Sequence, residues 1–291
     1  MNVGKCGICA FSIFFMMFIS IGIAGAASGQ TPEQKKHDQK KLDRRIDWGI
    51  SIQDYKWSEY LENGSKLLEE TGLLYTLAFD FESLGKYAGW RKYIGWRSGV
   101  NLFLGQVDYD GQTWSKLPVK TDVLYIGTKM YLDAVPTYRF DFGLRVKGFA
   151  GIGGRWWLRD LDDTKTKTGD SVKGSKEWWW CVYGRLGTGA DYSILRDLDI
   201  FTEVGVKIPI TARNNANLYV KGASRARLEP EQDISAFGDI GIRWKELAVK
   251  FSYNSLRFDR SDKVTAGTLE LYQPKSKADI YSLEVSWSKR F

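Results

Sequence analysis

The chain has 291 residues, a formal net charge of +7 and a mean hydropathy of −0.33. This average is too polar for a bundle of membrane helices. A membrane β-barrel is not excluded, because its strands alternate apolar and polar residues. Aromatic residues make up 14% of the chain and prolines number six, a composition that suits many strands joined by turns.

The N-terminal segment 1–27 has the three parts of a secretory signal peptide. Lys5 supplies a positive charge, residues 10–24 are apolar apart from two serines and a glycine, and small residues follow. We predict cleavage near Ala27 and export of the mature chain. An uncleaved anchor helix is the alternative, because the apolar run is nearly long enough to span a membrane.

Residues 28–45 are predicted to form a polar periplasmic tail. This segment is rich in charge and has no apolar face, so it predicts a solvated stretch or a short helix before the fold. A periplasmic plug or a binding arm is the functional alternative.

From Ile46 onward the dominant pattern is an alternation of period two, as in segment 203–210 (EVGVKIPI). Ten strands are predicted, near residues 46–58, 71–82, 88–109, 120–133, 137–158, 177–194, 199–212, 232–244, 247–258 and 278–291. Short connections near 82–86, 134–137, 195–198 and 245–246 alternate with long polar ones near 61–70, 111–119, 161–176, 214–231 and 260–277. Short turns at one end and long loops at the other are the layout of an outer-membrane barrel with both termini in the periplasm.

The last predicted strand alternates and ends on an aromatic residue, Phe291, which shares a face with Leu283 and Trp287. This strand resembles the C-terminal signature of bacterial outer-membrane barrel proteins, which the periplasmic barrel assembly machinery reads. The resemblance also covers the signal peptide and the strand layout. It implies an all-β fold, a transmembrane antiparallel up-and-down β-barrel over residues 46–291, in the outer membrane of a Gram-negative bacterium. Membrane lipid, lipopolysaccharide and the assembly machinery are the partners that it implies.

The polar face of the predicted strands carries charges of both signs. In a membrane barrel this face lines the lumen, whereas a soluble two-sheet sandwich would expose it to water. The signal peptide and the terminal Phe291 favour the barrel. The predicted lumen charge network consists of Arg97, Lys129, Arg145, Lys147, Arg185, Lys207, Arg243, Lys250, Asp80, Asp141, Glu203, Asp239 and Glu284. Side chains nearly fill a lumen of about ten strands, so we predict a largely filled one.

Tryptophans near the strand ends suit the two membrane–water interfaces, where amphipathic rings are favoured. The predicted interface aromatics are Trp48, Trp96, Trp178, Trp180, Trp287 and Phe291. Consecutive strand residues alternate faces, so the three rings of Trp178–Trp180 cannot all point one way. A carbohydrate-binding or lipid-binding platform is the alternative for this run.

The predicted barrel is similar in length and strand number to omptin proteases, which pair two outer-rim aspartates with an Asp–His dyad. Asp108 and Asp110 would correspond to the acidic pair, and a strand end entering a turn is their structural alternative. The facing rim near 210–215 has no histidine, and the single histidine of the chain, His37, lies in the tail. The resemblance therefore does not extend to catalysis, and no catalytic residue is assigned.

The sequence predicts no metal and no cofactor. Loop 160–170 carries four aspartates that could bind a divalent cation, but two lysines lie among them and the spacing is not that of a calcium loop. Cys6 and Cys9 lie in the signal peptide. The mature chain keeps Cys181 alone, so it can form no intrachain disulfide and no cysteine metal site.

These features favour a non-enzymatic outer-membrane barrel with a structural, surface-binding or adhesive role. A narrow porin-like channel for small solutes or ions is one alternative, and an omptin-like hydrolase with a degenerate site is another. The positive charge that remains after export is modest, so nucleic acid is not an expected partner. Lysines and arginines of the long loops would instead meet lipopolysaccharide phosphates.

Overall fold

The computed structural model describes residues 43–84, 94–113, 116–140, 142–166, 168–220 and 223–290. The predicted signal peptide, almost all of the predicted tail, Asp141 and Phe291 lie outside these residues. No helix within them is long and apolar enough to cross a membrane.

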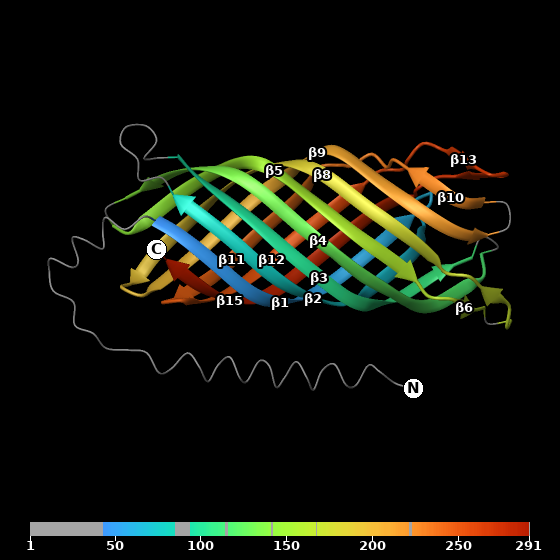
Figure 1. Cartoon of the computed structure of the whole chain (residues 1–291), viewed down its shortest axis with the longest axis horizontal. Coiled ribbons are helices and arrows are strands. Elements are labelled where there is room, and N and C mark those ends of the chain that lie inside the picture. The colour runs from blue at the N-terminus through green and yellow to red at the C-terminus, as the bar shows by residue number, and fades with distance from the viewer. Residues whose placement is uncertain are drawn as a thin grey trace. The chain divides into compact units, whose positions relative to one another are not determined.

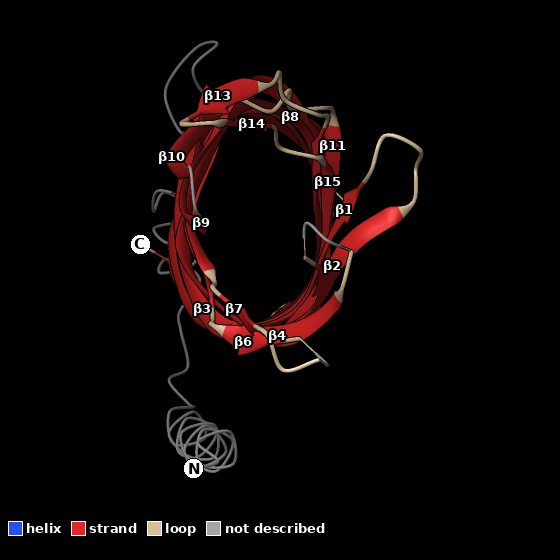
Figure 2. Ribbon diagram, turned by 90° about the vertical axis from the view of Figure 1, so that its right-hand side faces the viewer, coloured by secondary structure: helices blue, strands red, loops and turns tan. Residues whose placement is uncertain are grey.

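Ten long antiparallel strands close into a barrel (Figures 1 and 2). They are β1 (Asp43–Tyr60), β2 (Lys66–Leu84), β3 (Ile94–Gln112), β4 (Pro118–Arg139), β5 (Leu144–Leu161), β8 (Ser175–Leu195), β9 (Leu198–Val220), β11 (Ser235–Trp244), β12 (Leu247–Phe258) and β15 (Lys275–Arg290). Each strand pairs with the next barrel strand along the chain, and β1 pairs with β15 from Arg45↔Arg290 to Tyr60↔Lys275. The predicted ten-stranded up-and-down barrel is confirmed.

Five short strands lie in the long connections, at the end of the barrel opposite the chain's C-terminus (Figure 1). They are β6 (Thr164–Lys165), β7 (Ser171–Val172), β10 (Ala223–Leu228), β13 (Val264–Ala266) and β14 (Leu269–Leu271). β6 pairs with β7 and β13 with β14, while β10 pairs with the last part of β9. We call this the loop end. The other end carries the short turns, which face the periplasm in outer-membrane barrels.

The predicted turn at 134–137 is wrong. β4 continues to Arg139, and the chain reverses over 140–143, where Gly143 adopts a φ of 91° and the Phe140 N–H donates to the Leu144 carbonyl at 2.8 Å. The predicted turn contains Pro136. Pro136 instead lies in the strand, between the β4–β5 pairs Ala134↔Ala150 and Thr137↔Lys147. A proline is tolerated where the ladder does not need its missing N–H.

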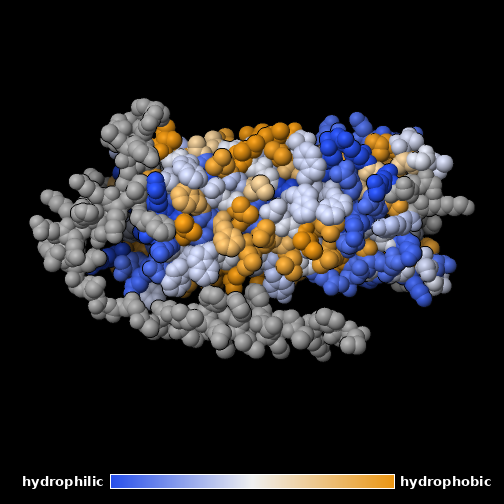
Figure 3. Space-filling view, viewed as in Figure 1, coloured by the Kyte–Doolittle hydropathy of each residue, from blue (hydrophilic) through white to orange (hydrophobic). Residues whose placement is uncertain are grey.

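Apolar side chains form a belt around the outside of the barrel (Figure 3). On β3, the outward Ile94, Trp96, Val100, Leu102 and Leu104 each expose between 41% and 58% of their surface. This run has the length with which a tilted strand crosses the hydrocarbon core, about 9–11 residues. β3 has 19 residues, so the remainder of the strand extends beyond the belt at the loop end. An apolar outer wall with charges inside is the arrangement that lipid requires.

A charge placed in the belt should destabilise the barrel, whereas the same charge just beyond it should not. We expect Leu102→Arg to lower the free energy of unfolding in lipid vesicles by about 2–4 kcal/mol, because an arginine near the bilayer midplane loses hydration. The matched control is Gln106→Arg, four residues along the same outer face, where Asp122 is within reach of the side chain. Urea titration measures both variants. Equal losses would contradict the position of the belt.

Candidate functional site

The loop-end half of the lumen is filled by aromatic rings. Trp57 of β1, Trp157 of β5, Trp179 of β8 and Phe258 of β12 are each at most 2% exposed. The rings of Trp157 and Trp179 stack with centroids 5.3 Å apart, and the Trp57 ring meets Trp179 edge-on at 5.4 Å. We call these four residues the aromatic seal.

The seal spans the lumen from wall to wall. β1 and β8 lie five strands apart in either direction around the ten-stranded barrel, so the contact between Trp57 and Trp179 joins opposite walls. Phe258 packs against both rings, at 6.0 Å from Trp57 and 5.5 Å from Trp179. Tyr55 and Tyr125 pack below these rings as part of the same buried cluster. Such packing leaves no room for a wide water column.

A ring of buried polar side chains accompanies the seal. Arg159 is held by two carboxylates: its Nε donates to Glu70 Oε1 at 2.8 Å and its Nη1 donates to Glu177 Oε1 at 2.6 Å. The Tyr125 hydroxyl donates to the second oxygen of Glu70. Glu70 is fully buried, so its negative charge depends on these donors.

The same network continues around the lumen. The Asn214 amide donates to Glu177 at 3.1 Å and to Gln273 at 2.9 Å, and Gln273 donates to Glu59 at 3.1 Å. The indole N–H groups of the seal join it, because Trp57 donates to Glu59 and Trp179 donates to Glu177. We call Glu59, Glu70, Arg159, Glu177, Asn214 and Gln273 the glutamate ring. Its hydrogen bonds to the indole N–H groups fix the orientations of Trp57 and Trp179.

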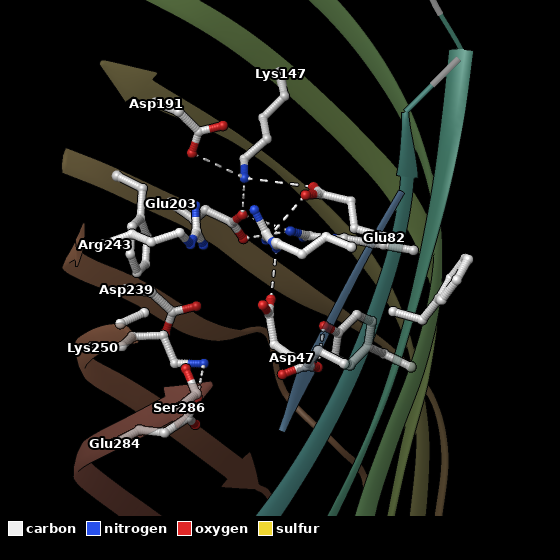
Figure 4. A pocket seen from close by; sticks show the side chains of 17 residues that line it. Asp47, Glu82, Lys147, Asp191, Glu203, Asp239, Arg243, Lys250, Glu284 and Ser286 are labelled. Atoms are coloured by element: carbon white, nitrogen blue, oxygen red, sulfur yellow. Dashed lines mark hydrogen bonds and ion pairs between the residues drawn. The ribbon is translucent and has the colours of Figure 1, made fainter. Parts of the chain in front are cut away.

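The other half of the lumen contains charged residues around a cavity of about 80 Å³, which we call the periplasmic cavity (Figure 4). Lys147 points at three carboxylates, with Nζ at 2.6 Å from Glu203, 3.6 Å from Asp191 and 4.0 Å from Glu82. Nearby, Lys250 pairs with Glu284 at 3.0 Å. Seven carboxylates line this cavity against five lysines and arginines, so its net charge is negative.

A second cavity of about 80 Å³ lies deeper in the lumen, and we call it the central cavity. It shares part of its lining with the periplasmic cavity, including Arg97 and Tyr131. Asp133, which is 1% exposed, accepts from two arginines that line this cavity, Arg97 and Arg185, each at 3.0 Å. Arg97 also pairs with Glu203 at 2.6 Å across the barrel.

The structure places the described members of the predicted lumen charge network on inward positions. Ion pairs join Arg97 and Lys147 to Glu203, Lys250 to Glu284, and Arg145 to Asp191. Lys207 has no carboxylate within 4.0 Å in the described part of the chain. The inward members are Arg97, Lys129, Arg145, Lys147, Arg185, Lys207, Arg243, Lys250, Asp80, Glu203, Asp239 and Glu284. Asp141 lies outside the described residues.

Sequence reasoning missed the seal, the glutamate ring and Asp133. Trp57, Trp157 and Trp179 have the same strand parity as inward charges, so parity could have placed them in the lumen. Asp133 lies within the predicted strand 120–133 and has the parity of Lys129, so parity could have placed it in the lumen as well. No pattern within one strand indicates that Arg159 meets Glu70, since their strands are not adjacent.

The predicted interface aromatics that the structure describes point outward. Trp48 and Trp96 are 41% and 47% exposed, and Trp178, Trp180 and Trp287 are half-buried on the outer wall. Trp179, between two of them, points inward, as the alternation of faces requires. Phe291 lies outside the described residues.

Asp108 and Asp110 lie near the loop end of β3 but on the outer wall. The inward residues there are Val107 and Tyr109, both buried. Asp110 forms an ion pair with the exposed Lys120 at 2.7 Å. Asp108 lies opposite Asp122 in the register of β3 and β4. The two carboxylates therefore do not face the lumen.

Two of the four aspartates of loop 160–170 form ion pairs with lysines. Asp160 pairs with Lys176 at 2.8 Å, and Asp163 pairs with Lys173 at 2.5 Å. The Lys173 ammonium and the Gly174 N–H hold the pKa of the Asp163 carboxyl below its ordinary value. These contacts occupy oxygens that a cation would need.

No protein-family model matches the chain, and no curated protein matches its sequence. Among solved structures, the chain is similar to the outer membrane protease OmpT from Escherichia coli, at 12% identity and a TM-score of 0.55, over 87% of this chain and 97% of that one. It also matches the toluene transporter TbuX of Ralstonia pickettii, at 11% identity and a TM-score of 0.39, over 86% and 90% of the two chains. The likeness to OmpT establishes a shared fold and nothing about activity.

The closed sheet, the apolar outer belt and this shared fold together define the class of protein. The chain is a ten-stranded outer-membrane β-barrel. Its loop-end lumen is packed with aromatic rings, and its charged cavities lie on the side of the short turns.

Loss of Arg159 should destabilise the barrel strongly. Arg159→Met leaves the fully buried Glu70 without its cation, and breaking a buried pair in this way costs about 3–5 kcal/mol of unfolding free energy. Adding Glu70→Gln to the same chain should restore part of the loss, because the fully buried carboxylate is then gone, whereas Glu177 still lacks its cation. Urea unfolding in lipid vesicles measures both.

The matched control is Lys120→Met, which removes the partner of Asp110 at an exposed pair. Surface pairs contribute little to stability, so no measurable change is expected. If Arg159→Met proved as stable as this control, the glutamate ring would not stabilise the fold.

Proposed function

We propose that this chain is a non-enzymatic outer-membrane barrel with a closed lumen, and that it has a structural, surface-binding or adhesive role at the cell surface. The aromatic seal carries the proposal. Its rings meet from opposite walls and its indole N–H groups bond to the glutamate ring. Closed packing of this kind suits a barrel that displays its loops rather than one that conducts solutes.

The loop end has the features of a display surface. Buried Ala226 and Leu228 of β10 pack with Ala266 and Leu271 of the β13–β14 hairpin in a small apolar cluster. This packing supports both segments beyond the barrel wall. Exposed charges of both signs lie beside them, such as the pair between Lys263 and Glu270 at 3.4 Å. Exposed charges of this kind steer and select charged partners.

The outward tryptophans support a place in an asymmetric outer membrane. Trp48, Trp96 and Trp287 lie towards the short-turn end and would meet the periplasmic headgroup layer. Trp178 and Trp180 lie towards the loop end, where Arg213 stacks on the Trp180 ring at 5.0 Å.

We propose lipopolysaccharide as the lipid partner at the level of Trp178 and Trp180. We also propose export through a cleaved signal peptide and recognition of β15 by the barrel assembly machinery.

A narrow channel is the second candidate, favoured by the two charged cavities. Planar-bilayer conductance separates it from the closed barrel. The purified protein is expected to give no stepwise currents, because the seal interrupts any water path. The double variant Trp57→Ala, Trp179→Ala is expected to conduct, since it removes rings from opposite walls.

Trp178→Ala is the matched control, because it removes a neighbouring tryptophan from the outer wall only. It should be as silent as the unmodified protein. Stepwise currents from the unmodified protein would overturn the closed lumen and favour the channel.

The proposal that the barrel is not an enzyme has its own test. The purified protein is expected to turn over neither peptides nor lipid A, because Asp108 and Asp110 face outward and His37 precedes the barrel. Product analysis by mass spectrometry measures turnover. Activity that Asp108→Asn abolishes would establish a hydrolase instead.

A further inference from the structure

The central cavity differs from the periplasmic cavity in the sign of its charge. Five lysines and arginines line the central cavity against four carboxylates, whereas carboxylates outnumber cations in the periplasmic cavity. Three of the four carboxylates have an ion-pair or hydrogen-bond partner in the protein. Glu203 pairs with Arg97, Glu284 pairs with Lys250, and Asp80 accepts from the Tyr131 hydroxyl at 2.7 Å. Arg97 and Arg185 both donate to Asp133. Arg155 and Lys129 are therefore the lining cations without an ion pair among the described residues, and Asp239 is the lining carboxylate without an ion-pair or hydrogen-bond partner there.

Arg155 is the clearest of these cations. It is 6% exposed, and its guanidinium carbon lies 4.2 Å from the centre of the Phe103 ring and 5.7 Å from that of Trp157. Its Nε is buried without a hydrogen-bond partner. In the described part of the chain no carboxylate lies within 4.0 Å of it. A buried charge in such surroundings is costly unless something neutralises it.

Lys129, which lines the central cavity, and Lys207, which lies beside it, are two further cations without an ion pair among the described residues. Lys129 is the direct cross-strand neighbour of Arg155, and like charges in that position repel. No ion pair involves Lys129 among the residues described. Lys207 is 1% exposed, and its Nζ donates to the neutral Asn254 side chain and to the Ser255 carbonyl at 2.7 Å. Asn254 itself lines the central cavity.

We propose that the central cavity binds one small oxyanion, of the size of phosphate, between Arg155 and Lys129. A guanidinium presents a planar fork of N–H groups that matches two oxygens of an oxyanion, and a lysine beside it adds a point charge. The cavity volume of about 80 Å³ is well above the space that one water needs. The anion would arrive from the periplasmic side, because the two cavities share lining residues and the seal closes the other end.

This site goes beyond the proposed display role and does not depend on it. An anion can occupy the central cavity whether or not the barrel conducts. Conductance therefore tests the closed lumen, and anion binding tests the site, with separate readouts.

Inorganic phosphate is the probe. The purified protein is folded in a detergent without phosphate groups, in a buffer whose only anion is bulky, and its Tm is followed by circular dichroism as phosphate is added. A saturable rise in Tm is expected, with sulfate giving a similar rise and chloride at equal ionic strength giving none. Arg155→Met and Lys129→Met should each weaken the apparent affinity at least tenfold.

Arg243→Met is the matched control. Arg243 is also a buried arginine with unpartnered nitrogens over an aromatic ring, 5.0 Å from Phe201, but it lines the acidic periplasmic cavity alone. Its variant should keep the phosphate response. Without phosphate, Arg155→Met should melt no lower than the unmodified protein, because it removes an uncompensated charge, whereas a purely structural arginine would lower Tm.

Three results would overturn the site: no saturable response to phosphate in the unmodified protein, an unchanged response in both Arg155→Met and Lys129→Met, or an equal response to chloride. The last would replace the oxyanion with any small anion. If Arg155→Met fails to fold, Lys129→Met decides, since it removes the neighbouring charge and leaves the guanidinium in place.

Discussion

Each barrel strand has hydrogen-bonded neighbours on both sides, and this closure is the constraint on which the other features depend. Lipid offers no water to satisfy a free strand edge, so a sheet can cross the membrane only if it closes on itself. Here β1 pairs with β15 along its whole length to complete the ring. Beyond β11, where β9 continues towards the loop end, β10 covers the exposed edge of β9. The outer wall can then be apolar, while every side chain of the opposite parity is directed into a narrow lumen.

That lumen is divided along its length by two kinds of packing. At the loop end, rings from opposite walls meet and exclude water, and the glutamate ring satisfies the polar atoms among them. Towards the short turns, arginines and lysines reach across to carboxylates on distant strands, as in the pair between Arg97 and Glu203. Both arrangements fill space, but only the second leaves cavities large enough for water or ions. A closed outer side and a hydrated periplasmic side follow from this division.

The two cavities also differ in charge, and this difference bears on what the barrel can hold. Carboxylates surround Lys147 in the periplasmic cavity, so its charge is neutralised within the protein. In the described part of the chain, Arg155 and Lys129 form no ion pair, and they are direct cross-strand neighbours of like charge. Burial of a charge is tolerated when a counter-charge is at hand. The proposed oxyanion site is compatible with the proposed display role, because it concerns the half of the lumen on the side of the short turns.

The sequence by itself determined the fold to a large extent. Alternation of period two identified the ten barrel strands and their inward and outward faces, because side-chain direction in a strand depends only on parity. It erred at 134–137, which was predicted as a turn but belongs to β4, a strand that continues to Arg139. The tertiary structure alone decided which inward residues meet: Trp57 with Trp179, Glu70 with Arg159, and Arg155 with no carboxylate among the described residues. Parity states the face of a residue but not its height in the barrel. That height depends on the register and tilt of strands far apart in the sequence, so only the closed barrel brings these side chains together.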